Sequence, residues 1–410
     1  MSTASPPTAG DAAAVNASEI APRPDTVKDG AVRALYIGII GCGVGGCTAA
    51  IMLRRQGHAV TLFEQTPRVG PVGAGVLLQA SGQRVLASLG LLDRVLARAE
   101  RIEELIAHTH HGRLLSRLRF ADRPGGHVAY GVHRGDLFGV LHDTLLAEGV
   151  ELCLNRTICR VGRDGRTLLD HSGAAAGRFD LIVAADGSRS RLRQSSGAQA
   201  YVHEYGPAAL WAVGRDPLVR GRLIQRARHT HQLCGLLPMG EERCSFFWGL
   251  NAADWPRLRE SSFEAWRATV VSLMPQARPV LSGFTRFSDL RFASYRAVWM
   301  PRVVHGRVAF LGDAAHASSP LLGHGINLAM LDARDLAAAV AFSTDVAGAL
   351  ETYNARQRWR NAYYSGLSAA LNPSFQGQST LIGVARDIVL PRLQRVGPAR
   401  RLMLRTLAGV

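Results

Sequence analysis

A glycine-rich turn between an apolar strand and a helical run constrains this chain more than any other feature. The apolar segment Leu35–Ile40 leads into Gly41-Cys42-Gly43-Val44-Gly45-Gly46, and helix-forming residues follow. Gly41, Gly43 and Gly46 have the spacing G-x-G-x-x-G, whose glycines form a tight turn and let backbone N–H groups approach a pyrophosphate. The next apolar strand, Ala59–Phe63, ends in Glu64, where an acid can accept hydrogen bonds from a ribose. The segment predicts a dinucleotide-binding unit.

A second segment in mid-chain has a related pattern. The apolar run Leu181–Ala185 delivers Asp186-Gly187 into a polar turn, and hydroxyl and cationic residues follow over Ser188–Arg193. An ordinary exit from a strand explains Asp186-Gly187 alone. The added donors indicate a place beside a phosphate, because cationic and hydroxyl groups make strong hydrogen bonds to phosphate oxygens.

A third segment lies in the last third of the chain. Val308–Leu311 reads as a buried strand that leads to Gly312-Asp313, and a turn containing Gly323 and Gly325 then opens an amphipathic helix. This arrangement brings a carboxylate to a ribose hydroxyl and directs a helix N-terminus at an anion.

Together the three segments resemble the class A flavoprotein monooxygenases, the group of para-hydroxybenzoate hydroxylase and salicylate hydroxylase. Members carry the glycine fingerprint, an Asp-Gly motif and a Gly-Asp motif in this order and approximate spacing. The resemblance spans about residues 34–359. His133-Arg134-Gly135-Asp136-Leu137 is similar to the family's helix start whose Arg contacts FAD. One departure is His324, because the family usually has Gln inside the Gly-x-Gly turn.

The resemblance implies FAD as the bound cofactor and NAD(P)H as a transient hydride donor, since the chain has a single dinucleotide fingerprint. It also implies the roles of individual residues: pyrophosphate, ribose or phosphate contacts for the first part of the chain, and contacts to the ribityl chain or the flavin ring edge for the last part. The implied cofactor-binding residues are Gly41, Gly43, Gly46, Glu64, Arg134, Asp186, Asp313, Pro320, Gly323, Gly325, Ile326 and Asn327.

The implied activity is hydroxylation of an aromatic or polycyclic small molecule by O₂, through a flavin C4a-hydroperoxide in a site that excludes water. Trp211, Phe246, Trp248 and Tyr295 are candidate pocket walls, and His229 or His231 is a candidate aid to phenol deprotonation. No catalytic acid or base is assigned. The identity of the substrate and the choice between NADH and NADPH stay open.

Four other functions stay open at this point. The chain could epoxidise a lipid or polyketide alkene, reduce prenyl-type double bonds, or bind and shield a reactive intermediate without catalysis. The fingerprint could also serve NAD in an ordinary dehydrogenase, although the second and third motifs argue against that. Halogenation is disfavoured, because the only lysine, Lys28, precedes the first strand.

The fold class expected is α/β: a Rossmann-like FAD-binding domain with an inserted antiparallel β-sheet substrate domain and C-terminal helices. We expect the FAD-binding domain to be discontinuous, over residues 34–100, 131–198 and 301–343. Residues 101–130 and 199–300 form the substrate-binding sheet, because period-two runs such as Arg243–Leu250 suit a half-buried antiparallel sheet. Residues 344–410 form a helical region, and residues 1–33 a disordered leader without an apolar stretch.

The composition limits the possible partners. A net charge of +16 suggests nucleic acid, but the arginines are scattered, and zinc-finger spacing, RNP motifs and basic arms are absent, so nucleic acid is not expected. The cysteines show no metal pairing and the histidine pairs are adjacent or alternate along strands, so no metal site is predicted. Without a signal or a membrane span, the expected location is cytoplasmic.

The C-terminal segment leaves two readings open. Leu, Ile and Val alternate with Arg at helical spacing over 381–386, 390–395 and 400–407. We favour helices that close over the core. The alternative is a basic amphipathic surface that makes peripheral contact with a membrane or meets a lipid-like substrate. Pro391 and Pro398 are expected to break any long helix here.

Overall fold

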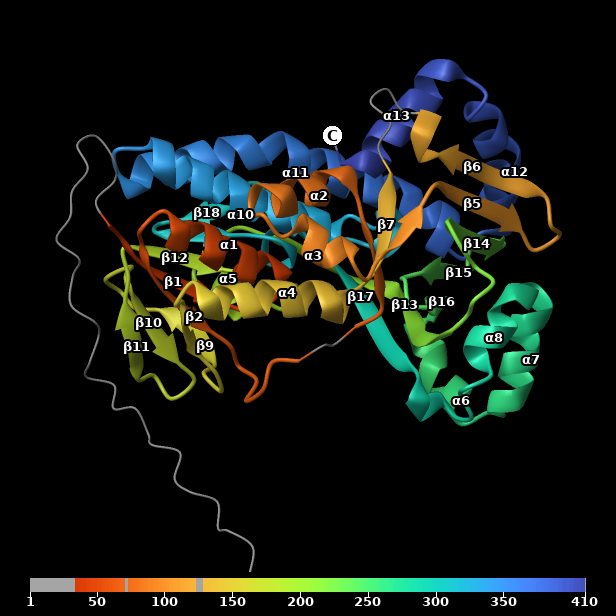
Figure 1. The fold of residues 1–410 in the computed structure, drawn as a ribbon, viewed down its shortest axis with the longest axis horizontal. Coiled ribbons are helices and arrows are strands. Elements are labelled where there is room, and N and C mark those ends of the chain that lie inside the picture. Colours follow the sequence, from red (N-terminus) through yellow and green to blue (C-terminus); the bar gives the residue numbers. More distant parts are fainter. Residues whose placement is uncertain (1–33, 71–72, 123–127, 410) are drawn as a thin grey trace, which may run out of the picture.

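The structure is a computed structural model that describes residues 34–70, 73–122 and 128–409. The predicted leader, residues 1–33, lies outside the described residues. Mixed α/β architecture with helices at the C-terminus is present, as the sequence predicts (Figure 1). The predicted division into domains stays a prediction, so the layers are described sheet by sheet.

A six-stranded sheet carries the glycine fingerprint. Its order is β18-β19-β12-β1-β2-β8, and every neighbouring pair is parallel except β18 with β19. Side chains such as Ile37 and Ile39 are fully buried, because helices cover a parallel sheet on both faces and favour continuous apolar strands. The strands are β1 (Tyr36–Ile40), β2 (Ala59–Phe63), β8 (Glu151–Cys153), β12 (Leu181–Ala184), β18 (Val304–His305) and β19 (Val308–Phe310).

The helices around this sheet pack on one another as well as on the strands. α1 packs against both α10 and α4, and α10 packs against α11 and α2 (Figure 1). Gly45 of α1 permits the close approach to α10, because a Cβ there would lie 3.1 Å from the Cβ of Ala329. The helices are α1 (Val44–Arg55), α2 (Ala80–Ser88), α3 (Leu92–Leu96), α4 (Arg134–Ala147), α5 (Arg191–Ser195), α9 (Asp313–His316), α10 (Gly325–Phe342) and α11 (Val346–Gln376).

A seven-stranded sheet of order β17-β13-β16-β15-β14-β5-β6 forms the other half of the molecule. Its pairs are antiparallel except β14 with β5, which run parallel. The strands are β5 (Glu104–Thr109), β6 (Leu114–Arg119), β13 (Tyr201–Arg215), β14 (Arg222–Arg228), β15 (Gln232–Pro238), β16 (Arg243–Asn251) and β17 (Arg291–Trp299). Three short helices, α6 (Trp255–Arg259), α7 (Phe263–Leu273) and α8 (Arg278–Leu281), lie on one end of it (Figure 1).

Two small antiparallel sheets complete the strand layers. One has the order β3-β7-β4, from β3 (Gly75–Leu78), β7 (Ala129–His133) and β4 (Glu100–Ile102). The other has the order β11-β10-β9, from β9 (Ile158–Val161), β10 (Thr167–Asp170) and β11 (Ala175–Arg178). Single 3₁₀ turns occur at η1 (Phe120–Asp122), η2 (Ala252–Asp254), η3 (Pro275–Ala277), η4 (Phe287–Asp289) and η5 (Pro320–Leu322).

The C-terminal segment forms α12 (Thr380–Leu393) and α13 (Gly397–Ala408). The prediction that Pro391 breaks the helix is wrong, because Pro391 lies inside α12. It sits two residues before the helix ends, where a proline removes one N–H donor without dividing the helix. Pro398 lies at the start of α13, a position that tolerates proline. In the described ranges, no helix has both the length and the apolar character needed to cross a membrane.

Candidate cofactor site and substrate face

The three predicted motifs meet at the carboxyl ends of β1, β12 and β19. The Gly41 N–H donates to the Phe63 carbonyl at 2.8 Å, which joins the ends of β1 and β2. Gly41 has φ +104°, and a Cβ there would lie 2.4 Å from the Ala185 carbonyl oxygen. A Cβ on Gly45 would lie 2.7 Å from Leu311 Cδ1. Gly41 requires glycine, because its backbone has a positive φ and touches the backbone of the second motif, and Gly45 lets the first motif pack closely on Leu311 of the third.

The other two fingerprint glycines face different surroundings. A Cβ on Gly46 would lie 2.0 Å from the Gly41 carbonyl oxygen, so Gly46 is needed by the fold itself. A Cβ on Gly43 would meet no described protein atom within 4 Å. Gly43 is the N-cap of α1, in extended backbone. The open space at the N-terminus of this helix suits an anion such as a pyrophosphate.

Glu64 connects the end of β2 to the glycine turn. Its carboxylate accepts hydrogen bonds from the Cys42 N–H at 2.9 Å, and from the N–H and the hydroxyl of Thr66 at 3.0 Å each. The residue is half-buried, and its bond to Cys42 holds the carboxylate next to the residue that precedes Gly43. Its predicted contact with a ribose stays a prediction.

Asp186 lies where β12 ends. One carboxylate oxygen accepts from the Arg191 N–H at 2.9 Å, and the other is buried with no hydrogen-bond partner in the described part of the chain. Burial raises the pKa of Asp186. A buried polar atom without a partner is costly unless a ligand satisfies it, so Asp186 fits a place beside a bound polar group.

Part of the Ser188–Arg193 segment has a structural role that the sequence did not indicate. Arg193 is buried and donates to the carbonyls of Ser188 at 2.7 Å and Ala314 at 2.6 Å. It therefore joins the second motif to the third, and it is not a free phosphate donor. The Ser190 hydroxyl accepts from the Arg193 N–H and caps α5.

The third motif places an exposed acid beside its glycine turn. Gly312 has φ +58° and precedes Asp313, which is exposed at the start of α9. A Cβ on Gly325 would lie 3.8 Å from Asp313 Oδ1, so the predicted carboxylate and turn are brought together. Gly323 has φ +62° and Pro320 is exposed on η5. Ile326 is half-buried at the start of α10.

A buried charge network lies beneath this motif. Asp332 of α10 accepts from the Gly312 N–H at 2.8 Å and contacts His316 Nε2 at 2.5 Å. Arg360 of α11 donates to Asp332 at 2.8 Å and to Asp335 at 2.6 Å. Burial opposes ionisation of Asp332 and of His316, but their mutual attraction outweighs it, lowering the pKa of Asp332 and raising the pKa of His316. The network holds the Gly312 turn in place through the Gly312 N–H, and it therefore fixes the position of Asp313.

Asn327 has its side chain committed to the protein. Its carbonyl oxygen accepts from the Gln79 N–H at 2.9 Å, and its amide donates to the Leu77 carbonyl at 2.9 Å. The side chain is fully buried, so it fastens α10 to the end of β3. A cofactor contact through Asn327 stays a prediction, and it would have to use the backbone.

His324, the residue that departs from the family pattern, is buried against the C-terminal helices. Its ring centroid lies 4.6 Å from that of Tyr364. Within the described chain neither ring nitrogen has a hydrogen bond of normal geometry, and burial lowers the pKa of His324 to about 4. The ring is therefore neutral at physiological pH.

Arg134 begins α4 and is exposed. Its N–H donates to the Ala74 carbonyl at 3.2 Å, and its Cδ lies 2.7 Å from where a Cβ on Gly73 would stand. The two residues before β3, Gly73 and Ala74, thus run alongside Arg134. Contact of its guanidinium with a phosphate or ribose stays a prediction.

The four candidate wall residues are divided between the two faces of the seven-stranded sheet. Phe246 and Trp248 face Trp266 of α7, with ring centroids 6.4 and 6.1 Å apart, and belong to a closed apolar core. Trp211 lies on the opposite face, where its ring centroid is 5.5 Å from that of Phe247. The Tyr295 side chain interacts with Trp211 on that same face. Alternation along strands explains this division, although the sequence did not show which parity faces inward.

The face of the sheet that carries Trp211 and Phe247, called the inner face below, adjoins η5 and the Gly323–Gly325 turn that follows it. Phe247 and Leu321 of η5 pack against the same apolar cluster, together with Phe375 and Leu390. The sheet therefore lies over the third motif. Phe247 is the aromatic residue of β16 on this face, and the sequence reasoning named Phe246 instead, because two adjacent aromatic residues offered no signal to choose between them.

The histidines predicted as surface or pocket-wall residues gather at one end of the seven-stranded sheet, where β5 ends and β14 turns into β15. The ring of His110 lies 3.8 Å from that of His111 and 4.9 Å from that of His229, and His229 lies 5.5 Å from His231. Over the described residues, no group of three or more His, Cys, Asp or Glu has an arrangement that could hold a metal ion.

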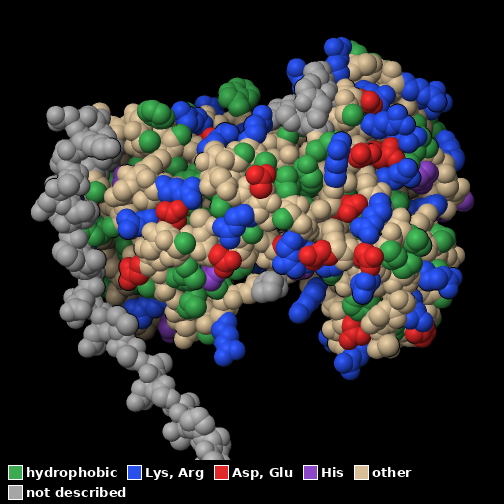
Figure 2. Space-filling view, in the orientation of Figure 1, with side chains coloured by type: hydrophobic (Ala, Val, Ile, Leu, Met, Phe, Trp, Pro, Cys, Tyr) green, Lys and Arg blue, Asp and Glu red, His purple; other side chains and the backbone are tan. Residues whose placement is uncertain are grey.

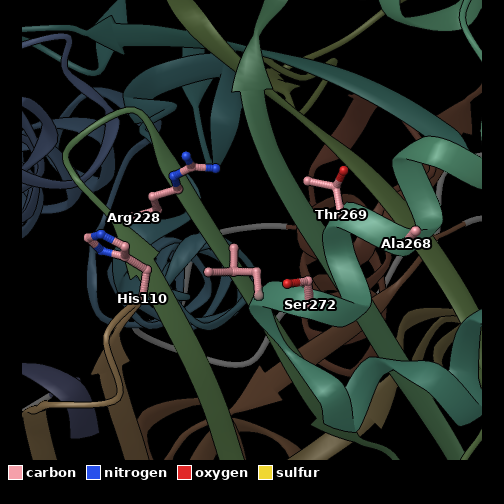
Figure 3. A pocket seen from close by; sticks show the side chains of 6 residues that line it. His110, Arg228, Ala268, Thr269 and Ser272 are labelled. Carbon is pink, nitrogen blue, oxygen red and sulfur yellow. The ribbon is translucent and has the colours of Figure 1, made fainter.

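A recess of about 520 Å³ lies near these histidines. Side chains of His110 and Arg228 face Thr269 and Ser272 of α7 across it (Figure 3). None of its lining residues belongs to the three motifs, so this recess is separate from the motif junction.

The motif junction fits FAD in its donors and its shape: an open space at Gly43, an unpartnered carboxylate oxygen on Asp186 and an exposed carboxylate on Asp313. Comparison with known proteins agrees with this. The model of the FAD binding domain family matches residues 35–362. Among relatives, 2-heptyl-3-hydroxy-4(1H)-quinolone synthase of Mycobacteroides abscessus is 30% identical over 88% of this chain and 94% of its own.

Two further comparisons extend the match. The 3-amino-4-hydroxybenzoate 2-monooxygenase of Streptomyces cremeus is 30% identical over 74% of this chain and 78% of its own length. A tetrameric form of 2-methyl-3-hydroxypyridine-5-carboxylic acid oxygenase is 25% identical, with a TM-score of 0.75 over 86% of this chain and 96% of its own. The chain therefore belongs to the class A FAD-dependent monooxygenases, the aromatic hydroxylases that use FAD, NAD(P)H and O₂.

Proposed function

We propose that this monooxygenase hydroxylates a flat, uncharged nitrogen heteroaromatic ring of the 4(1H)-quinolone class. The balanced reaction converts a ring C–H, O₂, NAD(P)H and H⁺ into a ring C–OH, H₂O and NAD(P)⁺. The observation that carries the proposal is the uncharged, aromatic central part of the inner face, around Trp211 and Phe247, which lies beside η5 and the Gly323–Gly325 turn. The relative from Mycobacteroides abscessus, whose name states a 3-hydroxy-4(1H)-quinolone product, supports the same class.

The register of the three central strands defines this inner face. Residue 209 pairs with 249, 211 with 247, 235 with 247 and 237 with 245, so these positions share one side. Around Trp211 and Phe247, the residues of β13, β15 and β16 on this side are not ionisable. They are Ala209, Trp211, Leu233, Gly235, Leu237, Ser245, Phe247 and Gly249. The same side continues to Arg215 and Arg243 at one end of β13 and β16, and to Arg291 on β17. A carboxylate placed against these eight residues would have no cationic partner among them, and burying an unpaired charge is costly. A neutral ring gains instead by stacking on Trp211 or Phe247.

The chain's own residues then perform three tasks. The motif junction binds and orients FAD, which when bound accepts electrons from NAD(P)H and activates O₂. The N-terminus of α10 directs positive partial charge toward the turn Gly323–Gly325, which favours negative charge on a group bound there. The apolar face of the sheet keeps water away from the reacting ring.

The direct test uses purified protein loaded with FAD. We expect 2-heptyl-4(1H)-quinolone to accelerate NADH or NADPH oxidation and to yield a product that carries one atom from ¹⁸O₂. The control compound is 3-amino-4-hydroxybenzoate, a phenol with a carboxylate. Turnover of the carboxylate compound with no response to the quinolone would contradict the proposed substrate class.

A matched pair of variants tests the inner face. Phe247→Leu removes one aromatic ring from it, and an aromatic contact contributes about 0.5–1.5 kcal/mol, so KM for the quinolone should rise about 2- to 10-fold. Phe292→Leu is the control, because Phe292 stacks on Trp255 on the other face of the sheet. Equal effects of the two substitutions on KM would refute the assignment of the face.

A further inference from the structure

Helix α12 has its apolar side turned outward. Its inward arc holds Gly383, Arg386 and Leu390, whereas its outward arc is almost entirely apolar. Leu381 is 82% exposed and Val389 55% exposed. A helix on the surface of a globular protein normally shows the reverse pattern. The exposed residues of this outward face are Leu381, Ile382, Val384, Ala385, Ile388, Val389, Arg392 and Leu393.

The inward arc shows that this orientation is fixed. Arg386 is buried, donates to the carbonyls of His229 at 2.9 Å and Ser374 at 2.8 Å, and lies over the Phe375 ring. The Gln394 side chain accepts from the Arg117 N–H at 3.0 Å. Rotating α12 to bury its apolar residues would break these contacts and expose Leu390, which packs in the cluster beside the substrate sheet.

The charges around this face have one sign. Residues 379–409 contain six arginines and one acid, Asp387, which is paired with Arg386. Arg400 is paired with Asp122. The other four, Arg392, Arg395, Arg401 and Arg405, are exposed. Figure 2 shows arginine side chains, in blue, on this end of the molecule, where Figure 1 places α12 and α13.

The adjoining helix continues the same surface. Val396 and Leu402 are 51% and 57% exposed. A hollow of about 230 Å³ is lined by Pro398, Arg401, Leu402 and Arg405, so two guanidinium-bearing side chains border an apolar floor. Guanidinium groups bind phosphate oxygens well.

We propose that the outward face of α12, with Arg401 and Arg405 of α13, docks on an anionic phospholipid bilayer. Aliphatic side chains flanked by arginines are the pattern of helices that lie in the plane of a membrane interface, and basic groups near the surface are attracted to anionic lipids. A second copy of the chain fits less well, because two-fold symmetry would oppose arginines to arginines. This docking does not depend on which ring the enzyme hydroxylates.

Vesicle sedimentation of the full FAD-loaded chain tests the proposal. The protein is mixed with vesicles of phosphatidylcholine alone, or with about 30 mol % phosphatidylglycerol, in about 0.1 M and about 0.5 M NaCl. We expect binding to the anionic vesicles at low salt to exceed binding to neutral vesicles by about tenfold or more, and to fall at high salt. Leu381→Ser combined with Val389→Ser should lower it at least about tenfold, as should Arg401→Glu combined with Arg405→Glu.

The control is Leu218→Ser, which removes an apolar side chain that is 79% exposed elsewhere on the molecule. It should leave vesicle binding unchanged, and all variants should keep the wild-type melting temperature and FAD content. Absence of binding to anionic vesicles would overturn the proposal, as would equal loss in the control. A wild-type dimer in analytical ultracentrifugation that Leu381→Ser with Val389→Ser dissociates would overturn it in favour of self-association.

Discussion

The substitution Gly43→Ala tests whether the glycine at this position is needed for FAD binding or for folding. A Cβ at Gly43 meets no described protein atom within 4 Å, and its backbone is extended, so alanine fits the folded chain. Replacing glycine at a compatible position changes stability by about 1 kcal/mol or less. The added methyl instead occupies the space that a pyrophosphate would enter. Losing two hydrogen bonds to a charged group, at about 1.5–3 kcal/mol each, predicts a rise in the FAD dissociation constant of at least about 100-fold.

The assay combines FAD titration by fluorescence with urea unfolding of the apoprotein. Gly139→Ala in α4 is the matched control, since a Cβ there also meets no described protein atom within 4 Å. Gly46→Ala provides the contrast, because its Cβ would lie 2.0 Å from a backbone oxygen and should destabilise the apoprotein itself. If Gly43→Ala bound FAD as tightly as the wild type does, the pyrophosphate would not lie at Gly43.

Two further predictions concern buried charge. Asp332→Asn leaves Arg360 and His316 without their shared carboxylate, so the unfolding free energy should fall by about 3–5 kcal/mol in urea titrations; a change below about 1 kcal/mol would show that the network contributes little. His324 stays neutral in the folded protein because burial lowers its pKa to about 4, whereas the unfolded chain takes up a proton below about pH 6.5. The wild type should therefore lose stability as pH falls from 6.5 toward 4, and His324→Gln should be spared a loss of about 2 kcal/mol between pH 8 and pH 5. An identical difference between the two proteins at both pH values would refute a buried neutral His324.

Sequence reasoning located the three motifs but not what holds them together. The cationic segment Ser188–Arg193 predicts phosphate donors, whereas Arg193 donates to two protein carbonyls. A signal for Asp332 did exist, since it is an acid within the apolar run of α10. Its partners His316 and Arg360 come from α9 and α11, and no local spacing relates the three.

Local sequence by itself determined the strands that lead into the three motifs, the glycine turns and the family of this chain. Close backbone approach demands glycine, and buried parallel strands demand continuous apolar runs, so these features are written in short segments. Tertiary structure alone decided which side chains of the large sheet face η5 and which face α7, because Phe246 and Phe247 differ only in what packs against each face. It also decided that α12 turns its apolar side outward. Helical spacing reports an apolar stripe, and only the buried contacts of Arg386 determine whether that stripe faces the core or the exterior.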